Sequence, residues 1–220
     1  MNTDRVRVKI CGITRPEDGA EAGRLGADAI GLVFYPPSPR HVSLDTAQAV
    51  VAALPPFVTV VALFVNAAES EIRRVLAALP VGLIQFHGDE PPEECRRYGR
   101  PYLKALRMAP DTDVAANAAR YGDAAGILLD SYQPGVPGGT GRTFQWARVP
   151  PLHCPLILAG GLTPDNVAQA IATVRPYGVD VSGGVEREKG IKDAARMADF
   201  IARVRAVESR GQETETKSET

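Results

Sequence analysis

A thiol and a cation share one face of a short strand near the start of the chain. Within residues 5–14, apolar side chains alternate with polar ones, so a period of two places Lys9 and Cys11 together on the polar face. Cys11 falls at the carboxyl end of this strand, directly before Gly12. A neighbouring positive charge favours the thiolate form, which makes Cys11 a candidate proton-transfer group. An isolated cysteine is more often a small buried apolar residue, so this prediction depends on what the fold places beside it.

A carboxyl group closes a second apolar run. Asp130 ends the stretch Gly126-Ile-Leu-Leu-Asp130, where a buried strand is expected to give way to a loop. A carboxyl group in that position is poorly solvated and can act as a general acid. An aspartate that caps the following turn is the alternative, and it carries equal weight when Asp130 is considered alone. Paired with the thiol of Cys11, Asp130 would complete an acid/base couple suited to moving protons on a sugar or a carbonyl compound.

Two glycine-rich turns late in the chain have the composition of an anion-binding site. Residues 159–166 read Ala-Gly-Gly-Leu-Thr-Pro-Asp-Asn, and residues 181–186 read Val-Ser-Gly-Gly-Val-Glu. Glycine lets backbone N–H groups approach an anion closely, and a helix that starts after the turn adds a favourable dipole. One glycine pair is common in ordinary turns, but two pairs at neighbouring strand ends predict a phosphate site and a small phosphorylated substrate. The residues assigned to this site are Gly160, Gly161, Ser182, Gly183 and Gly184.

Two proline-containing loops carry further candidates. Residues 36–41 include Arg40, whose planar guanidinium suits a carboxylate on the substrate, although a surface arginine with a solvated head would look the same. Residues 133–141 are too rich in glycine and proline to form an element, so they are either a lid or a long irregular connection. The histidines show no metal-ligand spacing, which argues against a metal site and favours a structural role for His87. Other polar residues expected at strand ends are Gln85 and Asp180.

The apolar pattern supplies the elements that must position these candidates. The expected strands cover residues 5–14 with the following turn included, 29–34, 58–65, 81–86, 102–106, 125–130, 156–159 and 178–181. The expected helices cover residues 14–26, 43–54, 69–79, 91–98, 112–121, a weak stretch at 144–149, 165–173 and 194–207. Strands that alternate with helices in this way predict a parallel sheet with right-handed crossovers.

Eight strand–helix units within 220 residues fit a minimal (β/α)8 TIM barrel, which is an α/β fold with a single domain. A doubly wound open sheet is the competing architecture. Its phosphate loop GxGxxG is expected after the first strand, where this chain reads CGITRPEDG. We therefore predict a barrel over residues 1–207 and a polar, disordered tail over residues 208–220. In a barrel of this kind the carboxyl ends of the strands form the working face, which is where the candidate residues fall.

The composition of the chain narrows its partners and its compartment. A formal net charge of −1 gives no reason to expect nucleic acid or an anionic membrane as a partner. No apolar run approaches the roughly 20 residues that cross a bilayer, and the first residues lack the apolar core of a secretory signal. Cys11, Cys95 and Cys154 are odd in number and far apart, which argues against a disulfide framework and predicts the reducing cytoplasm.

Several motifs, taken in order, resemble one enzyme family. They read KICGIT, PPSPRHVS, QFHGDE, LLDSYQPGVPGGTG, LAGGLTPDNV and DVSGGVE followed by KGIKD. This series resembles the phosphoribosylanthranilate isomerase family of tryptophan biosynthesis. The resemblance implies an Amadori rearrangement of N-(5-phosphoribosyl)anthranilate to 1-(2-carboxyphenylamino)-1-deoxyribulose 5-phosphate. It implies general acid/base catalysis without a cofactor, in a monomer or a homodimer.

The resemblance also implies a role for each matching residue. Cys11 is similar to the general base that removes the C2 proton of the ribose, and Asp130 to the general acid that protonates the furanose oxygen. Arg40 resembles the arginine that pairs with the anthranilate carboxylate, and the glycines and Ser182 of the two turns resemble the phosphate-binding positions. The chain departs from the family at Gly183, where a second serine is common, so one hydroxyl contact to the phosphate is expected to be missing.

Other interpretations stay open at this level. A sister barrel acting on a related phosphorylated ribose could be an epimerase, which would bring metal-ligand histidines, or a dual-substrate isomerase, which would use paired aspartates in place of the thiol. A non-catalytic barrel could instead retain the fold only to bind a phosphorylated ligand. Its binding would be indifferent to the loss of Cys11 or Asp130, which separates it from the enzymes.

Overall fold

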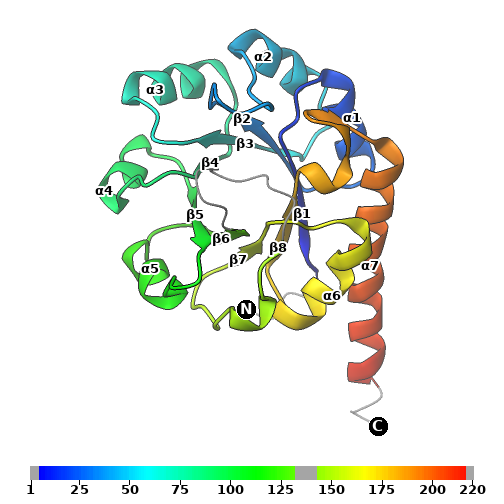
Figure 1. Cartoon of the computed structure of the whole chain (residues 1–220). Coiled ribbons are helices and arrows are strands. Elements are labelled where there is room, and N and C mark those ends of the chain that lie inside the picture. Colours follow the sequence, from blue (N-terminus) through cyan, green and yellow to red (C-terminus); the bar gives the residue numbers. More distant parts are fainter. Residues whose placement is uncertain (1–4, 132–142, 217–220) are drawn as a thin grey trace.

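The computed structural model describes the backbone of residues 5–131 and 143–216, and the side chains of residues 5–131 and 143–207. Its strands form a closed parallel barrel inside a ring of helices (Figure 1). Each strand pairs with the next one in the sequence, and the last pairs with the first to close the ring. The strands are β1 (Arg7–Cys11), β2 (Ala29–Val33), β3 (Thr59–Phe64), β4 (Leu83–Phe86), β5 (Tyr102–Met108), β6 (Gly126–Ser131), β7 (Leu156–Leu158) and β8 (Gly178–Val181). The predicted (β/α)8 barrel is confirmed, and the open sheet is excluded by the pairing of β1 with β8.

The helices cover the outer wall of the barrel (Figure 1). They are α1 (Pro16–Arg24), α2 (Leu44–Ala52), α3 (Glu69–Ala78), α4 (Pro92–Cys95), α5 (Val114–Arg120), α6 (Pro164–Val174) and α7 (Ala194–Thr216). Short 3-10 turns form η1 (Arg96–Tyr98), η2 (Trp146–Arg148) and η3 (Gly183–Val185), and a small antiparallel hairpin joins β9 (Glu186–Glu188) to β10 (Ile191–Lys192). No helix within residues 5–131 and 143–216 is both long enough and apolar enough to cross a membrane.

Local sequence signals place several of these helix starts. Ser43 caps α2 by accepting a hydrogen bond from the backbone N–H of Thr46 at 3.1 Å. Asp113 caps α5 in the same way, since its carboxylate accepts from the N–H of Ala116 at 2.9 Å. Proline stands in the first turn of α1, α4 and α6, where a missing N–H costs no intrahelical bond.

The structure corrects three expectations about the elements. The weak helix expected at residues 144–149 is only the single turn η2, because Pro150 and Pro151 follow it after one residue and prevent its continuation. The closing helix α7 does not end at Val207 but continues to Thr216. The β9–β10 hairpin was not predicted, since residues 186–192 lack the apolar alternation of a strand.

Alternation along the strands separates two layers of side chains. On β1, Val8 and Ile10 are wholly buried in the large core between the strands and the helices. Lys9 and Cys11 point the other way, toward the barrel interior, where Lys9 meets Asp180 of β8. The shared face predicted for Lys9 and Cys11 is therefore confirmed. A second, smaller apolar cluster is separate from that core, and it consists of Leu103, Ala105, Leu128, Ile157 and Ala159.

Candidate active site

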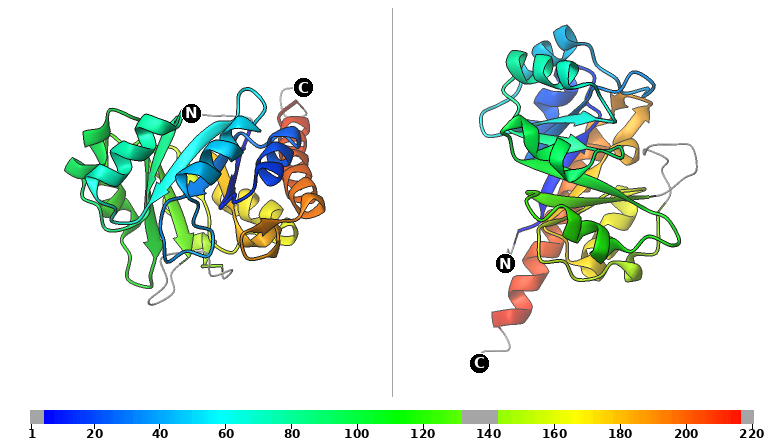
Figure 2. Two further views of the ribbon diagram at one scale, coloured as in Figure 1. Left: turned by 90° about the horizontal axis from the view of Figure 1, so that it is seen from above. Right: turned by 90° about the vertical axis from the view of Figure 1, so that its left-hand side faces the viewer.

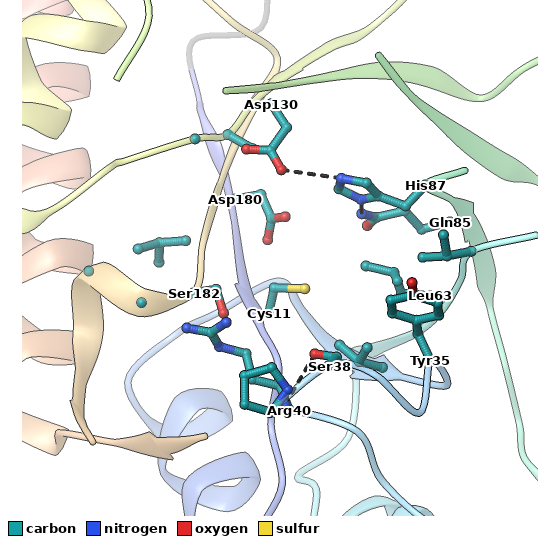
Figure 3. Close-up of a pocket in the computed structure, with 18 of the residues that line it drawn as sticks. Cys11, Tyr35, Ser38, Arg40, Leu63, Gln85, His87, Asp130, Asp180 and Ser182 are labelled. Atoms are coloured by element: carbon teal, nitrogen blue, oxygen red, sulfur yellow. Dashed lines mark hydrogen bonds and ion pairs between the residues drawn. The ribbon is translucent and has the colours of Figure 1, made fainter. Parts of the chain in front are cut away.

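A pocket of about 360 Å³ opens among the carboxyl ends of the strands. All the residues assigned to chemistry or binding from the sequence line this one pocket, namely Cys11, Arg40, Asp130, Gly160, Gly161, Ser182, Gly183 and Gly184. They come from loops and strand ends far apart in the chain, and the barrel gathers them because all eight strands run in the same direction. Figure 3 shows Cys11 lying between the Asp130–His87 pair on one side and Arg40 on the other. The predicted loop at residues 133–141 lies outside the described residues.

Asp130 sits at the end of β6 with both carboxylate oxygens occupied. Oδ1 accepts a hydrogen bond from the backbone N–H of Ser131 at 2.8 Å. Oδ2 lies 3.2 Å from Nε2 of His87, an ion-pair distance without hydrogen-bond alignment (Figure 3). The other ring nitrogen of His87 lies 3.0 Å from Nε2 of Gln85, which is wholly buried. His87, for which the sequence favoured a structural role, thus lies directly beside the candidate acid.

The side chain of Gln85 bears on how His87 is held. Its Nε2 is a donor only, so this contact places an acceptor, and not a proton, at Nδ1 of His87. The tautomer that follows carries its proton on Nε2, toward Asp130. The carbonyl oxygen Oε1 of Gln85 is buried and has no partner among residues 5–131 and 143–207.

Cys11 lies beside a buried ion pair on the barrel interior. Lys9 Nζ donates to Oδ1 of Asp180 at 3.0 Å, and both side chains are almost fully buried. Burial raises the pKa of the Cys11 thiol, and the nearby Lys9 ammonium opposes that rise. Burial is the largest single influence on Lys9 and would lower its pKa, but the charges and hydrogen bonds of Asp180 and Cys11 together outweigh it, so the pKa of Lys9 is raised and Lys9 stays charged. The thiol thus has a permanent cation as its neighbour.

Arg40 is held by a carboxylate that the sequence analysis did not single out. Its Nε and Nη2 donate to the two oxygens of Glu186, each at 2.7 Å. Lys192 also donates to Glu186, at 2.8 Å, and reaches the backbone oxygen of Ser182 at 3.2 Å. Burial would raise the pKa of Glu186, but these two cations outweigh it and lower the pKa. The hydrogen bonds to Glu186 likewise raise the pKa of Arg40.

Glu186 and Lys192 were missed because they lie in a charged stretch that, by pattern alone, resembles a solvated loop. What marks both residues is their burial in the β9–β10 hairpin, and only the tertiary structure shows that burial. In the sequence, Glu186 and Lys192 stand out only because they lie in the GVE and KGIKD segments, which resemble the isomerase family.

The two glycine-rich turns pack against each other at the edge of the pocket. Gly160 and Gly161 adopt left-handed φ angles of 81° and 66°, which glycine adopts without strain. A side chain at Gly184 would begin 1.9 Å from the carbonyl oxygen of Leu162, so only glycine allows the turns to approach this closely. Asn166 at the start of α6 secures the first turn, since its Nδ2 donates to the oxygen of Gly161 at 2.9 Å. The result is a rim of backbone with few side chains.

Comparisons of the sequence with known proteins point to one family. The family model of N-(5'phosphoribosyl)anthranilate (PRA) isomerase matches residues 8–203. An N-(5'-phosphoribosyl)anthranilate isomerase from Stutzerimonas stutzeri is 61% identical over 203 residues, which cover 92% of this chain and 98% of the relative. One from Nitrosococcus oceani is 60% identical over 204 residues, covering 92% of this chain and 99% of the relative.

Two solved structures that resemble this chain come from the same family. The phosphoribosyl anthranilate isomerase from Thermotoga maritima is 40% identical, with a TM-score of 0.84, and the match covers 91% of this chain and 99% of that one. A phosphoribosyl anthranilate isomerase in complex with reduced 1-(o-carboxyphenylamino)-1-deoxyribulose 5-phosphate is 38% identical, with a TM-score of 0.79 over the same shares of the two chains. With a family model that spans most of its length and relatives at this level of identity, the chain belongs to the N-(5'-phosphoribosyl)anthranilate isomerase family.

Proposed function

We propose that this chain catalyses the Amadori rearrangement of N-(5-phosphoribosyl)anthranilate to 1-(2-carboxyphenylamino)-1-deoxyribulose 5-phosphate in tryptophan biosynthesis, with Asp130 as general acid and Cys11 as general base. The observation that carries the assignment is that a carboxyl group and a thiol line the same pocket at the carboxyl face of the barrel. The complex of a related isomerase with the reduced product supports the same choice of ligand.

The reaction needs one proton delivered and another removed. As general acid, Asp130 gives a proton to the furanose oxygen as the bond from C1 to that oxygen breaks. The lone pair of the anthranilate nitrogen then forms a C=N bond to C1, which yields an open-chain Schiff base. The thiolate of Cys11 removes the proton from C2, and the electrons of that C–H bond form a C1=C2 double bond while the C=N electrons return to nitrogen. The Cys11 thiol then gives its proton to C1, and the Asp130 carboxylate takes the proton of the C2 hydroxyl, which leaves the ketone and returns both groups to their starting forms.

The neighbours of the two groups suit these roles. The ammonium of Lys9 stabilises the thiolate form of Cys11, which must exist before the C2 proton can be taken. His87 Nε2 lies 3.2 Å from Oδ2 of Asp130, and we propose that this contact limits how the carboxyl group can turn. Neither role requires a cofactor, because both protons move between side chains and substrate.

The two ends of the substrate have candidate partners on the remaining walls of the pocket. Arg40 pairs with the anthranilate carboxylate, for which a guanidinium is a geometric match. The backbone rim of Gly160, Gly161, Gly183 and Gly184, with the hydroxyl of Ser182, binds the phosphate. Because Gly183 has no side chain, only its backbone N–H can contact the phosphate at that position.

The assembly and the compartment are also proposals. One isomerase of known structure from Thermotoga maritima is dimeric, and we propose for this chain either a monomer or a homodimer, which sedimentation distinguishes. We propose the cytoplasm as its location, since Cys11, Cys95 and Cys154 are all free thiols.

A fluorescence assay tests the proposed activity. Purified protein, treated with a chelator, is mixed with N-(5-phosphoribosyl)anthranilate, and the decay of the anthranilate fluorescence is followed against a reaction without protein. We expect turnover that the chelator does not change. A barrel that binds the substrate without accelerating its decay would be the non-catalytic binder, and the proposal would be withdrawn.

A further inference from the structure

We infer that Glu186 is a positioning residue that holds Arg40 in the orientation which selects a substrate with a carboxylate. This inference rests on the proposed pairing of Arg40 with the anthranilate carboxylate. It adds that the preference for that carboxylate is set by a residue that does not touch the substrate.

Glu186 holds Arg40 through two parallel hydrogen bonds, a contact that we call the clamp. Both carboxylate oxygens bond the guanidinium along one edge, at Nε and Nη2, so the planar group cannot rotate about its long axis without losing both bonds. The two side chains are only 5% and 11% exposed. Nη1 has no hydrogen-bond partner among residues 5–131 and 143–207, and Arg40 lines the pocket. The two N–H groups of Nη1 and the second N–H of Nη2 are therefore the donors left for a ligand.

Glu186 is itself anchored from behind. The ammonium of Lys192 is fully buried and donates to Oε1 of Glu186 at 2.8 Å. The backbone N–H of Lys192 in turn donates to the carboxylate of Asp18 in α1 at 3.1 Å. The clamp is thus built from the β9–β10 hairpin and secured to the helical ring, so Glu186 cannot follow Arg40 if a ligand pulls on it.

Two glycines make the room in which Arg40 lies. A side chain at Gly12 would begin 2.4 Å from Cδ of Arg40, and one at Gly183 would begin 3.2 Å from Nη2. The backbone of Gly183 does not have a left-handed φ angle, so no backbone strain requires glycine there. We therefore attribute the missing side chain at Gly183 to the space that the guanidinium occupies (Figure 3 shows Arg40 beside Ser182).

With Arg40, Lys192 and Glu186 ionised and the Cys11 thiol protonated, two cations face one carboxylate, and the carboxylate of a ligand would neutralise the group. A buried charge is costly unless it is paired, so a ligand that brings a carboxylate to Nη1 completes the cluster. A phenylamino ligand without that group leaves the cluster with its excess charge.

The test compares two ligands that differ only in the carboxyl group. They are reduced 1-(o-carboxyphenylamino)-1-deoxyribulose 5-phosphate and its phenylamino counterpart, and their Kd values are measured by calorimetry for the wild-type chain and for Glu186→Gln. We expect Glu186→Gln to reduce the preference for the carboxylated ligand by about tenfold or more and to leave binding of the phenylamino ligand nearly unchanged. We also expect KM to rise more than kcat falls.

Matched variants separate this effect from general damage. Glu21 holds the surface residue Arg24 with the same two-bond geometry, at 2.7 and 2.5 Å, so Glu21→Gln controls for the loss of a glutamate–arginine clamp and should change neither Kd. Gly183→Ala leaves Glu186 in place but crowds Nη2, and it should reduce the carboxylate preference as well. Because both ligands carry the phosphate, any effect of Gly183→Ala on phosphate binding cancels in the ratio.

Arg40→Ala shows which idea fails if the results disagree. If Arg40→Ala abolishes the preference but Glu186→Gln and Gly183→Ala leave it intact, the positioning role is wrong while the proposed function stands. If Arg40→Ala leaves the preference intact, the pairing in the proposed function is wrong, and the inference falls with it. A stronger preference in Glu186→Gln would mean that Glu186 competes with the ligand for Arg40, which would also overturn the inference.

Discussion

Cys11 and Asp130 have different neighbours within one pocket, and those neighbours suit different halves of a proton exchange. Cys11 has the ammonium of Lys9 beside it, whereas Asp130 has an imidazole and a backbone N–H. The sequence was sufficient to propose both residues because each closes an apolar strand. It was not sufficient to assign His87, since a histidine two residues after a buried glutamine has no pattern that distinguishes a structural role from one beside the acid.

Removing either proton-transfer group should affect turnover far more than binding. We expect Cys11→Ser and Asp130→Asn each to lower kcat by about 10²–10⁴-fold, because each loses a proton transfer that substrate binding does not need. The Kd of the reduced product should stay within a few-fold of the wild-type value. Cys154→Ser is the matched control for the thiol, and turnover equal to wild type in either of the first two variants would refute the assignments.

The pH dependence of the reaction should report the thiol. Burial raises the pKa of Cys11, and Lys9 only partly opposes it, so a larger fraction of Cys11 is protonated and inactive at neutral pH than for an ordinary thiol. We expect kcat/KM to rise with pH and to level off only above the ordinary pKa of a cysteine. The rate of alkylation of Cys11 by iodoacetamide should rise along the same curve, and a kcat/KM that is flat with pH while alkylation climbs would contradict Cys11 as the base.

His87 should matter to the rate and not to affinity. His87→Asn removes the ring nitrogen that lies 3.2 Å from Asp130 and leaves Gln85 in place, so the carboxyl group loses its orientation but the pocket keeps its walls. We expect kcat to fall by about tenfold or more with little change in KM. The exposed His153 serves as a control through His153→Asn, and a His87→Asn variant with normal kcat would return His87 to a purely structural role.

At the scale of the elements, the parallel strands bring residues from distant parts of the sequence together at one end and in the interior of the barrel. The register of β1 against β8 pairs Lys9 with Asp180, so two residues 171 positions apart meet inside the barrel. The apolar alternation of these strands was visible in the sequence. The β9–β10 hairpin was not, because its two short strands are stabilised by buried ion pairs and not by an apolar face.

The contact between the two glycine turns gives a prediction at this scale. Gly184→Ala would place a methyl group 1.9 Å from the carbonyl oxygen of Leu162, and the two turns would have to separate at a cost of roughly 1–3 kcal/mol. We expect the Kd of the phosphorylated product analogue to rise and that of its dephosphorylated form to change little.

Gly122→Ala is the control for that measurement, since a side chain there would meet only one atom, at 3.8 Å. If Gly184→Ala weakened both ligands equally, the turns would not form a phosphate site, and the substrate assignment would lose its support at that end of the pocket.

For the whole molecule, the question is where the domain ends. The buried residues that α7 contributes to the core include Phe200, Ile201 and Val204, and Val207 packs against its edge. Beyond them α7 projects past the rest of the molecule as far as Thr216 (Figure 2). Helix α7 continues past residue 207, so the end of the domain expected there is not an end of secondary structure. It remains a prediction that the residues after 207 do not contribute to stability.

Ending the chain after Val207 tests that boundary. Because the core contacts of α7 precede the cut, we expect the free energy of unfolding in urea to change by less than about 0.5 kcal/mol, with kcat and KM unchanged. Val204→Ala in the full chain is the positive control and should cost about 1–3 kcal/mol, since it empties a fully buried site. A large loss of stability in the shortened chain would place residues 208–220 within the folded domain.

The sequence by itself determined the fold class and the composition of the active face. Apolar periodicity and glycine content depend on residues that are neighbours in the chain, so the eight strands of the barrel, seven of the expected helices, the thiol, the acid and the glycine turns could all be recognised. The tertiary structure alone decided which polar side chains meet. Lys9 with Asp180, His87 with Asp130, and Arg40 with Glu186 and Lys192 are pairs that no local pattern specifies. They arise because the closed barrel removes water from polar side chains of distant segments, and each buried charge must then find its partner there.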